Sequence, residues 1–158
     1  RYTDTYRHWD MIAMGYKANM FDIQAALLLP QIPKLEERLK RRAEIWQAYD
    51  NGFADLKGIE RPKIVKYLTH ARHLYTIWVD SRKRYTILLA LQKKGIGVVV
   101  NYRAVHLLDF YRKTFGYLRG SFPVAERIGD QTLTLPLNPS LSDDEVEKVI
   151  RAVREVAT

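Results

Sequence analysis

The sequence predicts an α+β fold, in which a long helix precedes a small, mostly antiparallel sheet of three strands that is covered by helices. Two observations predict this class. An apolar seam with helical spacing runs through the first third of the chain. Further along, three short stretches rich in β-branched and aromatic residues alternate with helical patterns.

The long helix is predicted from the seam and is expected to be interrupted. Its apolar positions follow one another at intervals of 3, 4 or 7 residues: Leu28, Ile32, Leu35, Leu39, Trp46 and Tyr49. Pro30 and Pro33 each remove a backbone amide donor, so we expect a break near Leu29 and a regular helix from Pro33 or Lys34 onward. Asn51 and Gly52 are expected to end this helix.

Three strands are predicted from runs of β-branched and aromatic residues. They are expected at residues 73–80, 96–102 and 131–137. The second is the most continuously apolar, so we expect it to be the central strand of the sheet. Pro136 ends the third strand or marks it as an edge.

Helices are predicted between and after these strands. They are expected at residues 82–94, within 107–120, at 123–130 and at 142–156. The last has the clearest pattern, because Ser142 and Glu145 form a capping box at its start. Its buried positions are expected to be Val146, Val149, Ile150 and Val153.

The chain divides into three predicted segments. Residues 1–20 are expected to be irregular, residues 21–51 to form the long helix, and residues 52–158 to form a small α+β domain. A chain of 158 residues is long enough to bury a core of its own. It begins with Arg1 and shows neither an initiator Met nor the apolar segment of a signal peptide, so we expect it to be part of a longer protein.

Composition excludes several classes of protein. The chain has no Cys, which excludes a disulfide framework and a thiolate metal site and suits the cytoplasm, where we expect the protein to act. No stretch reaches the roughly 20 apolar residues of a membrane span. The net charge of +8 is spread over several elements and interrupted by acidic residues, so we expect no nucleic-acid partner.

The first candidate binding stretch is residues 15–26, where Lys17 and Asn19 precede the long helix. An ammonium group and an amide at that place can hold a phosphate. The alternative is a plain helix start, with Asp22 as the N-cap and Lys17 in solvent.

The second candidate stretch is residues 95–106, in which Tyr102, Arg103 and His106 follow a predicted buried strand. Folds that combine helices with sheets commonly bind ligands past the carboxyl end of a strand. The alternative is a loop whose histidine and arginine bond to nearby carbonyl groups. The chain's four histidines have no carboxylate at ligand spacing, so no metal site is expected.

Taken in order, these stretches resemble the DegT/DnrJ/StrS family of sugar-nucleotide aminotransferases, which depend on pyridoxal 5'-phosphate (PLP). The resemblance spans about residues 9–156. It is carried by the following motifs: Gly-Tyr-Lys-Ala-Asn-Met-Phe-Asp-Ile-Gln-Ala-Ala at 15–26, Lys-Arg-Arg at 40–42, His-Leu-Tyr-Thr-Ile-Trp-Val-Asp at 73–80, Lys-Gly-Ile-Gly at 94–97, Tyr-Arg-Ala-Val-His at 102–106, Phe-Tyr at 110–111, Phe-Pro-Val-Ala-Glu-Arg-Ile at 122–128, Leu-Thr-Leu-Pro-Leu at 133–137 and Leu-Ser-Asp-Asp-Glu-Val at 141–146.

The resemblance implies the C-terminal small domain of a fold type I PLP enzyme, a homodimer that aminates a keto-sugar nucleotide with glutamate as the amino donor. Such enzymes serve the biosynthesis of cell-surface polysaccharides or of antibiotic amino sugars. In this family the PLP-binding lysine precedes the Gly-Tyr motif, so the resemblance implies no catalytic residue in this chain and an inactive isolated fragment.

The resemblance also assigns roles to individual residues. Lys17 and Asn19 would bind the phosphate of the PLP in the neighbouring subunit. Tyr102, Arg103 and His106 would border the substrate cleft, where Arg103 would meet the nucleotide diphosphate or the donor's carboxylate. The alternative reading is a stand-alone interaction or regulatory module that descends from the small domain and has no catalytic role.

Overall fold

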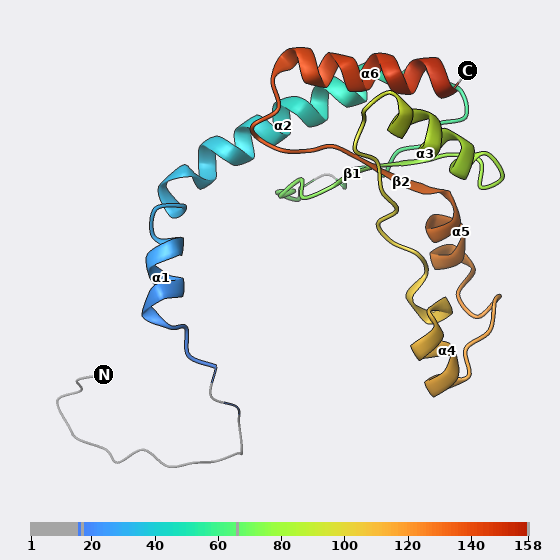
Figure 1. The fold of residues 1–158 in the computed structure, drawn as a ribbon, viewed down its shortest axis with the longest axis horizontal. Coiled ribbons are helices and arrows are strands. Elements are labelled where there is room, and N and C mark those ends of the chain that lie inside the picture. Colours follow the sequence, from blue (N-terminus) through green and yellow to red (C-terminus); the bar gives the residue numbers. More distant parts are fainter. Residues whose placement is uncertain (1–15, 17, 66, 158) are drawn as a thin grey trace. The chain divides into compact units, whose positions relative to one another are not determined.

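A computed structural model of the protein describes residues 16, 18–65 and 67–157 (Figure 1). The chain divides into two compact units, one ending at Leu35 and the other beginning at Glu36. Each unit is described by itself.

The first unit contains α1, at Asp22–Leu28, and a 3-10 turn, η1, at Ile32–Lys34, directly before α2 (Leu35–Gly52). The predicted break near Leu29 and the end at Gly52 are confirmed. The N-cap of α1 is Phe21, whose backbone N–H donates to the side chain of Gln24 (3.1 Å), so Asp22 is not the cap. No residue of α1 is buried, and its apolar side chains are exposed.

The second unit is organised around a two-stranded antiparallel sheet. β1 (Tyr75–Trp78) pairs with β2 (Thr132–Leu135), and Ile77 lies opposite Leu133. Tyr75 and Ile77 of β1 point into the core, whereas β2 is buried along its whole length. The first and third predicted strands are therefore confirmed, with shorter bounds.

The predicted central strand at residues 96–102 is wrong. Only Val99 of this segment bridges to Thr134, through hydrogen bonds of 3.3 and 2.8 Å, so the segment flanks β2 rather than lying between two strands. Its apolar residues are not all buried: Ile96 and Val98 face the core, while Val99 is 51% exposed. The apolar residues of this segment therefore lie on both of its faces, and only one face packs against the core.

Helices cover this small sheet. The predicted helices are present as α3 (Arg84–Lys93), α4 (Asp109–Phe115), α5 (Pro123–Gln131) and α6 (Asp143–Ala157), and a 3-10 turn, η2, forms at Val105–Leu107. Among the described residues, no helix combines the length and apolar character that crossing a bilayer requires. The α+β class is confirmed, with a smaller sheet than expected.

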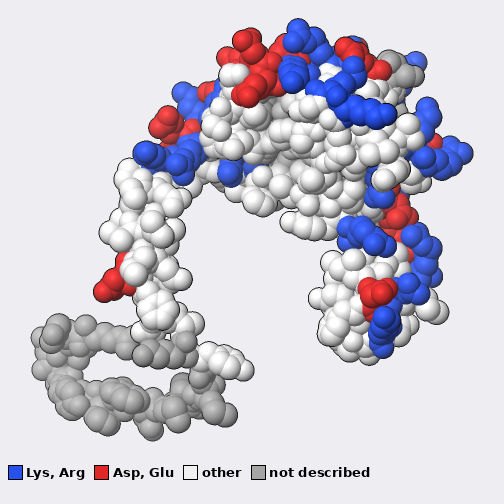
Figure 2. Space-filling view, viewed as in Figure 1, with Lys and Arg blue, Asp and Glu red and all other residues white. Residues whose placement is uncertain are grey.

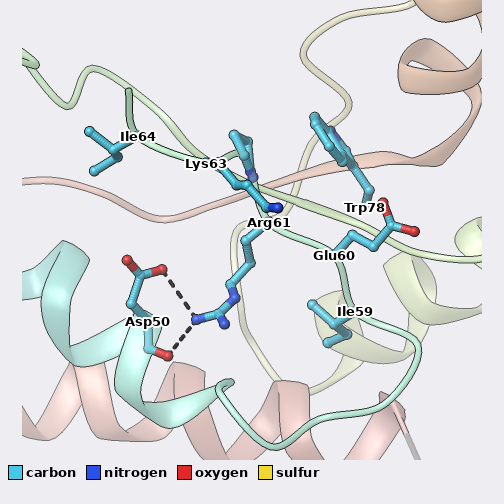
Figure 3. A pocket seen from close by; sticks show the side chains of 8 residues that line it. Asp50, Ile59, Glu60, Arg61, Lys63, Ile64 and Trp78 are labelled. Carbon is cyan, nitrogen blue, oxygen red and sulfur yellow. Dashed lines mark hydrogen bonds and ion pairs between the residues drawn. The ribbon is translucent and has the colours of Figure 1, made fainter. Parts of the chain in front are cut away.

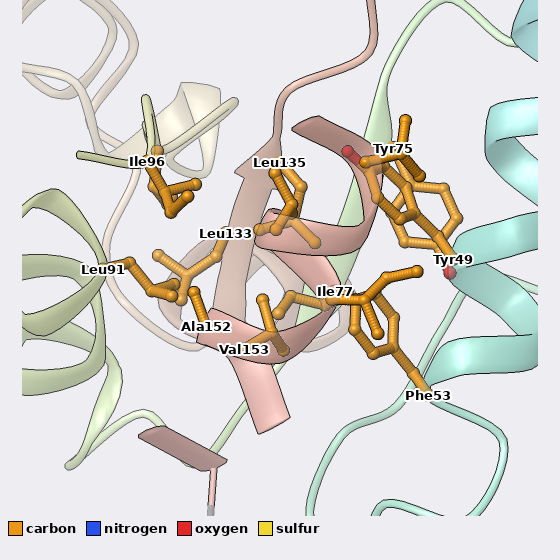
Figure 4. Packing of buried hydrophobic residues seen from close by; sticks show 14 of the residues in the cluster. Tyr49, Phe53, Tyr75, Ile77, Leu91, Ile96, Leu133, Leu135, Ala152 and Val153 are labelled. Carbon is orange, nitrogen blue, oxygen red and sulfur yellow. The ribbon is translucent and has the colours of Figure 1, made fainter. Parts of the chain in front are cut away.

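The core lies where α6 packs against the sheet, between α3 and the end of α2 (Figure 4). All four predicted inward residues of α6 are buried. Gly52 allows α2 to approach this helix closely, because a Cβ atom there would lie 2.7 Å from the Ile150 side chain. Leu91 of α3 completes the other side of the core.

Aromatic rings fill the side of the core next to α2. Tyr49 lies 4.9 Å from Tyr75 and 5.8 Å from Phe53, centroid to centroid, and Trp46 meets Tyr75 at 4.8 Å. The buried hydroxyl groups are both satisfied: Tyr49 donates to the Pro136 carbonyl and Tyr75 to the Asp50 carboxylate. Such ring pairs, two of them edge-on and one stacked, stabilise the fold beyond the area they bury.

The capping box at the start of α6 gives a first prediction. The Ser142 hydroxyl accepts the Glu145 backbone N–H (3.2 Å), and the Glu145 carboxylate accepts the Ser142 N–H (2.8 Å). Ser142→Ala removes one acceptor and should lower the free energy of unfolding by about 1 kcal/mol, measured by urea denaturation. Ser140→Ala, two residues earlier, is the matched control; an equal loss there would show that the cap contributes nothing specific.

The burial of β2 gives a second prediction. Leu133 is 0% exposed at the centre of the sheet. Leu133→Ala leaves a cavity in the core and should lower the free energy of unfolding by about 3 kcal/mol in the same measurement. Leu118→Ala, at a side chain that is 67% exposed, should change it by less than about 0.5 kcal/mol. A similar loss of unfolding free energy in both variants would contradict the burial of Leu133 in the core.

Candidate functional site

The three residues predicted in the second stretch separate into two groups. Tyr102 is 68% exposed, and Arg103 beside it is exposed as well. His106, in η2, is 7% exposed and points inward. The first two side chains are available to a ligand, whereas His106 is held in the interior.

His106 pairs with a buried carboxylate rather than with a carbonyl group. Its Nε2 lies 3.0 Å from Oε1 of Glu126, a residue of α5 that is 6% exposed. The same carboxylate accepts the backbone N–H groups of Gly120 (2.8 Å) and Phe122 (3.2 Å). Three donors therefore converge on one side chain.

These donors also set the charge state of Glu126. Burial alone would raise the pKa of its carboxyl group, but the hydrogen bonds from His106, Gly120 and Phe122 outweigh burial and hold the pKa below its ordinary value. The network therefore stabilises the fold above the ordinary carboxyl pKa, and this contribution is lost as the pH falls through the lowered value.

An open aromatic hollow of about 470 Å³ lies next to His106. The His106 ring meets Phe122 edge-on at 4.8 Å. The lining residues come from η2, α4 and the start of α5: Val105, His106, Tyr111, Phe115, Tyr117, Phe122 and Ala125. Its lining is mostly apolar, with the His106 imidazole and two tyrosine side chains among it.

Arginine side chains gather around Asp130, at the end of α5. Arg119 donates to its carboxylate at 2.8 Å and lies 3.8 Å from that of Glu126. The hydrogen bond from Arg119, together with the charges of Arg84 and Arg103, holds the pKa of Asp130 below its ordinary value. The three arginines thus face two carboxylates, those of Asp130 and Glu126, so a small excess of positive charge remains here for an anion.

The first predicted stretch lies in the other unit. Lys17 lies outside the described residues. Asn19 is exposed just before α1, and its side chain makes no hydrogen bond to another described residue. It borders an open hollow of about 590 Å³ whose remaining lining residues are mostly apolar.

A third hollow, of about 1000 Å³, lies beside the connection from α2 to β1 (Figure 3). Arg61 donates to both the carbonyl and the carboxylate of Asp50. The guanidinium of Arg127 lies 5.2 Å from the centre of the Trp78 ring and reaches Glu60 at 3.5 Å. These pairs brace the connection, so most of the charged groups here already have partners.

Two other kinds of site, a metal centre and a basic surface, depend on how metal ligands and basic side chains are grouped in the described residues. No cluster of three or more potential metal ligands occurs in residues 16, 18–65 and 67–157. On the face drawn in Figure 2, Lys and Arg side chains are spread over several elements with Asp and Glu between them.

The sequence analysis did not single out Glu126 or Gly129. Both are the buried residues of α5, three positions apart. The available signal was a glutamate and a glycine at helical spacing on the face of α5 that turns inward. Its meaning depends on contacts of Glu126 with His106, 20 residues earlier, and of Gly129 with Ala104, 25 residues earlier, which local patterns do not show.

Comparison with known proteins places the chain in a family. The family model described as the DegT/DnrJ/EryC1/StrS aminotransferase family matches residues 1–154. The uncharacterized protein MJ1066 of Methanocaldococcus jannaschii is 39% identical over 155 residues, which are 96% of this chain and 40% of that protein. The spore coat polysaccharide biosynthesis protein SpsC of Bacillus subtilis is 41% identical over 154 residues, 94% of this chain and 40% of SpsC.

The solved structures agree with the sequence comparison. Spr1654 of Streptococcus pneumoniae, solved in its PLP form, shares 34% identity with a TM-score of 0.83, over 94% of this chain and 38% of Spr1654. The chain thus spans about 40% of the length of the relatives it matches. With nearly its whole length matched, the chain belongs to the DegT/DnrJ/EryC1/StrS aminotransferase family.

Proposed function

We propose that this chain is the C-terminal part of a PLP-dependent aminotransferase that acts on a keto-sugar nucleotide in the cytoplasm, with glutamate as the amino donor. The observation that carries the proposal is the family match over residues 1–154. The relation to SpsC, a polysaccharide biosynthesis protein, favours a role in making surface polysaccharides over one in antibiotic biosynthesis.

The residues before α1 suit the phosphate of PLP. Asn19 offers an exposed amide donor, and Lys17, which lies outside the described residues, would add an ammonium group. When bound, PLP supplies the electron sink that an amino-group transfer requires. This chain would bind and orient its phosphate, while the lysine that holds PLP covalently would belong to the preceding part of the protein.

The partner we propose is a second copy of the protein. Apolar side chains of the first unit are exposed in the single chain: Phe21 at 75%, Ile23 at 77%, Leu27 at 65% and Leu29 at 66%. So many exposed apolar side chains on one short segment favour an interface. A homodimer would cover it and would bring Asn19 to the PLP of the neighbouring subunit.

Tyr102 and Arg103 are the proposed substrate contacts. Both are exposed, and Arg103 belongs to the cationic group around Asp130. A guanidinium binds a diphosphate through paired hydrogen bonds, and an exposed tyrosine ring offers a face to a sugar or a base. His106 is proposed to act on the loop, because its Nε2 is already engaged by Glu126.

A second candidate function is that of an interaction module without catalysis. One observation favours it: the second unit has a hydrophobic core of its own. The gene decides between the two. A preceding domain with a Ser-x-x-x-x-Lys motif supports the enzyme, whereas a start codon directly before Arg1 supports the module.

A covalent labelling experiment tests the inactivity proposed for the isolated fragment. Because the PLP-binding lysine would lie upstream, incubation of the 158-residue chain with PLP followed by borohydride should label no single lysine. Peptide mass spectrometry gives the measurement. If one lysine is labelled reproducibly and to completion, this part of the proposal is wrong.

A second prediction concerns the phosphate contact of Asn19. In the whole dimeric enzyme, Asn19→Ala removes a hydrogen-bond donor to a charged group and should weaken PLP retention by about tenfold, measured by equilibrium dialysis. The control is Asn51→Ala, at an exposed asparagine near the end of α2. Equal retention by Asn19→Ala and the unaltered enzyme would exclude the contact.

A further inference from the structure

The inward face of α5 meets the segment that carries the proposed substrate contacts. Only two residues of this helix are buried, Glu126 and Gly129, and their spacing of three places them on one face. Each of them contacts the segment at a different point, Glu126 at His106 and Gly129 at Ala104.

Gly129 makes the first contact, which is backbone to backbone. A Cβ atom at this position would lie 2.5 Å from the Ala104 amide nitrogen and 3.2 Å from the Arg103 carbonyl carbon. Backbone atoms cannot rotate away as a side chain can, so only glycine permits this approach. The Gly129 carbonyl also accepts a hydrogen bond from Arg84 (2.9 Å), which connects this turn of α5 to α3.

Glu126 makes the second contact, two residues further along the segment. Oε1 of its carboxylate binds the His106 ring and also accepts the N–H groups of Gly120 and Phe122. A buried carboxylate is costly unless donors surround it, so the three donors are held in one arrangement. Ala104 and His106 are thereby fixed at both contacts, directly after the exposed Tyr102 and Arg103.

We propose that Glu126 and Gly129 are positioning residues, which hold the segment 102–106 on α5 so that Tyr102 and Arg103 face the diphosphate of a nucleotide sugar. The inference rests on the proposed function of the site. Neither residue would touch the substrate: Glu126 would act through His106, and Gly129 through the backbone of Arg103 and Ala104.

A purely structural role for Glu126 makes a different prediction. If its carboxylate served only to order the turn at residues 120–122, its loss would lower stability and leave ligand binding by Arg103 unchanged. A positioning role instead makes the effects of Glu126 and Arg103 interdependent. A double-mutant cycle measures this interdependence directly.

The experiment uses the whole enzyme and calorimetric titration with UDP, dTDP and GDP, of which the one that binds the unaltered protein most tightly is the probe. Arg103→Ala, Glu126→Ala and Gly129→Ala are each expected to weaken its binding by about tenfold. In the Arg103→Ala background, Glu126→Ala should weaken binding by less than about threefold more, because the charged one of the two side chains that it positions is gone and only Tyr102 remains.

Val153→Ala controls for general destabilisation, since Val153 is buried in the core on α6. It should lower the melting temperature and leave binding of the probe unchanged. Effects of Glu126→Ala and Arg103→Ala that multiply fully in the double variant would overturn the positioning role and leave Arg103 as a ligand contact. If Arg103→Ala binds the probe as tightly as the unaltered enzyme, Arg103 is not a ligand contact. In that case the proposed role of Arg103 and the positioning role of Glu126 and Gly129 are both wrong.

Discussion

The buried strand β2 determines where the parts of the candidate site lie. It pairs with β1 along one edge, and through Thr134 it bridges to Val99 on the other. Val99 stands three residues before Tyr102, and α5 runs directly into β2 at Thr132. The loop and the helix that contacts it are therefore attached to the same four-residue strand. Because every residue of that strand is buried, a shift of either attachment would disturb the core as well.

The sequence predicts elements well where the determining contacts are local. The capping box of α6, its four inward residues and the interruption before Leu35 all follow from neighbours within a few positions, and all are found. The strand at residues 96–102 shows the limit of this reasoning. A run of apolar residues indicates that a segment can be buried, but it does not show which strand the segment pairs with. β1 pairs with one edge of β2, and the segment 96–102 meets the other edge of β2 only at Val99.

The site shows the same limit more sharply. Tyr102 and Arg103 are recognisable as polar and aromatic residues past a buried segment, and both are exposed as a ligand contact requires. His106 looks equivalent to them in the sequence, yet its environment is set by Glu126, twenty positions later. The stretch 102–106 therefore combines residues of two kinds, exposed ones such as Tyr102 and a buried one, His106. Only the position of α5 distinguishes them, and that position follows from the course of the chain through β2.

Separating the two kinds of residue has a physical advantage for binding an anion. A guanidinium in solvent pays conformational entropy each time it orders on a ligand, and a mobile backbone would add to that cost. Here the backbone on either side of Ala104 is held before any ligand arrives, by the close approach of Gly129 and by the carboxylate of Glu126. Asp130 and its surrounding arginines add a second effect, since the local positive charge favours an anionic ligand without a dedicated partner for every cation. The entropy cost of ordering this backbone is thus met when the chain folds, and an anionic ligand would have to order only exposed side chains such as Tyr102 and Arg103.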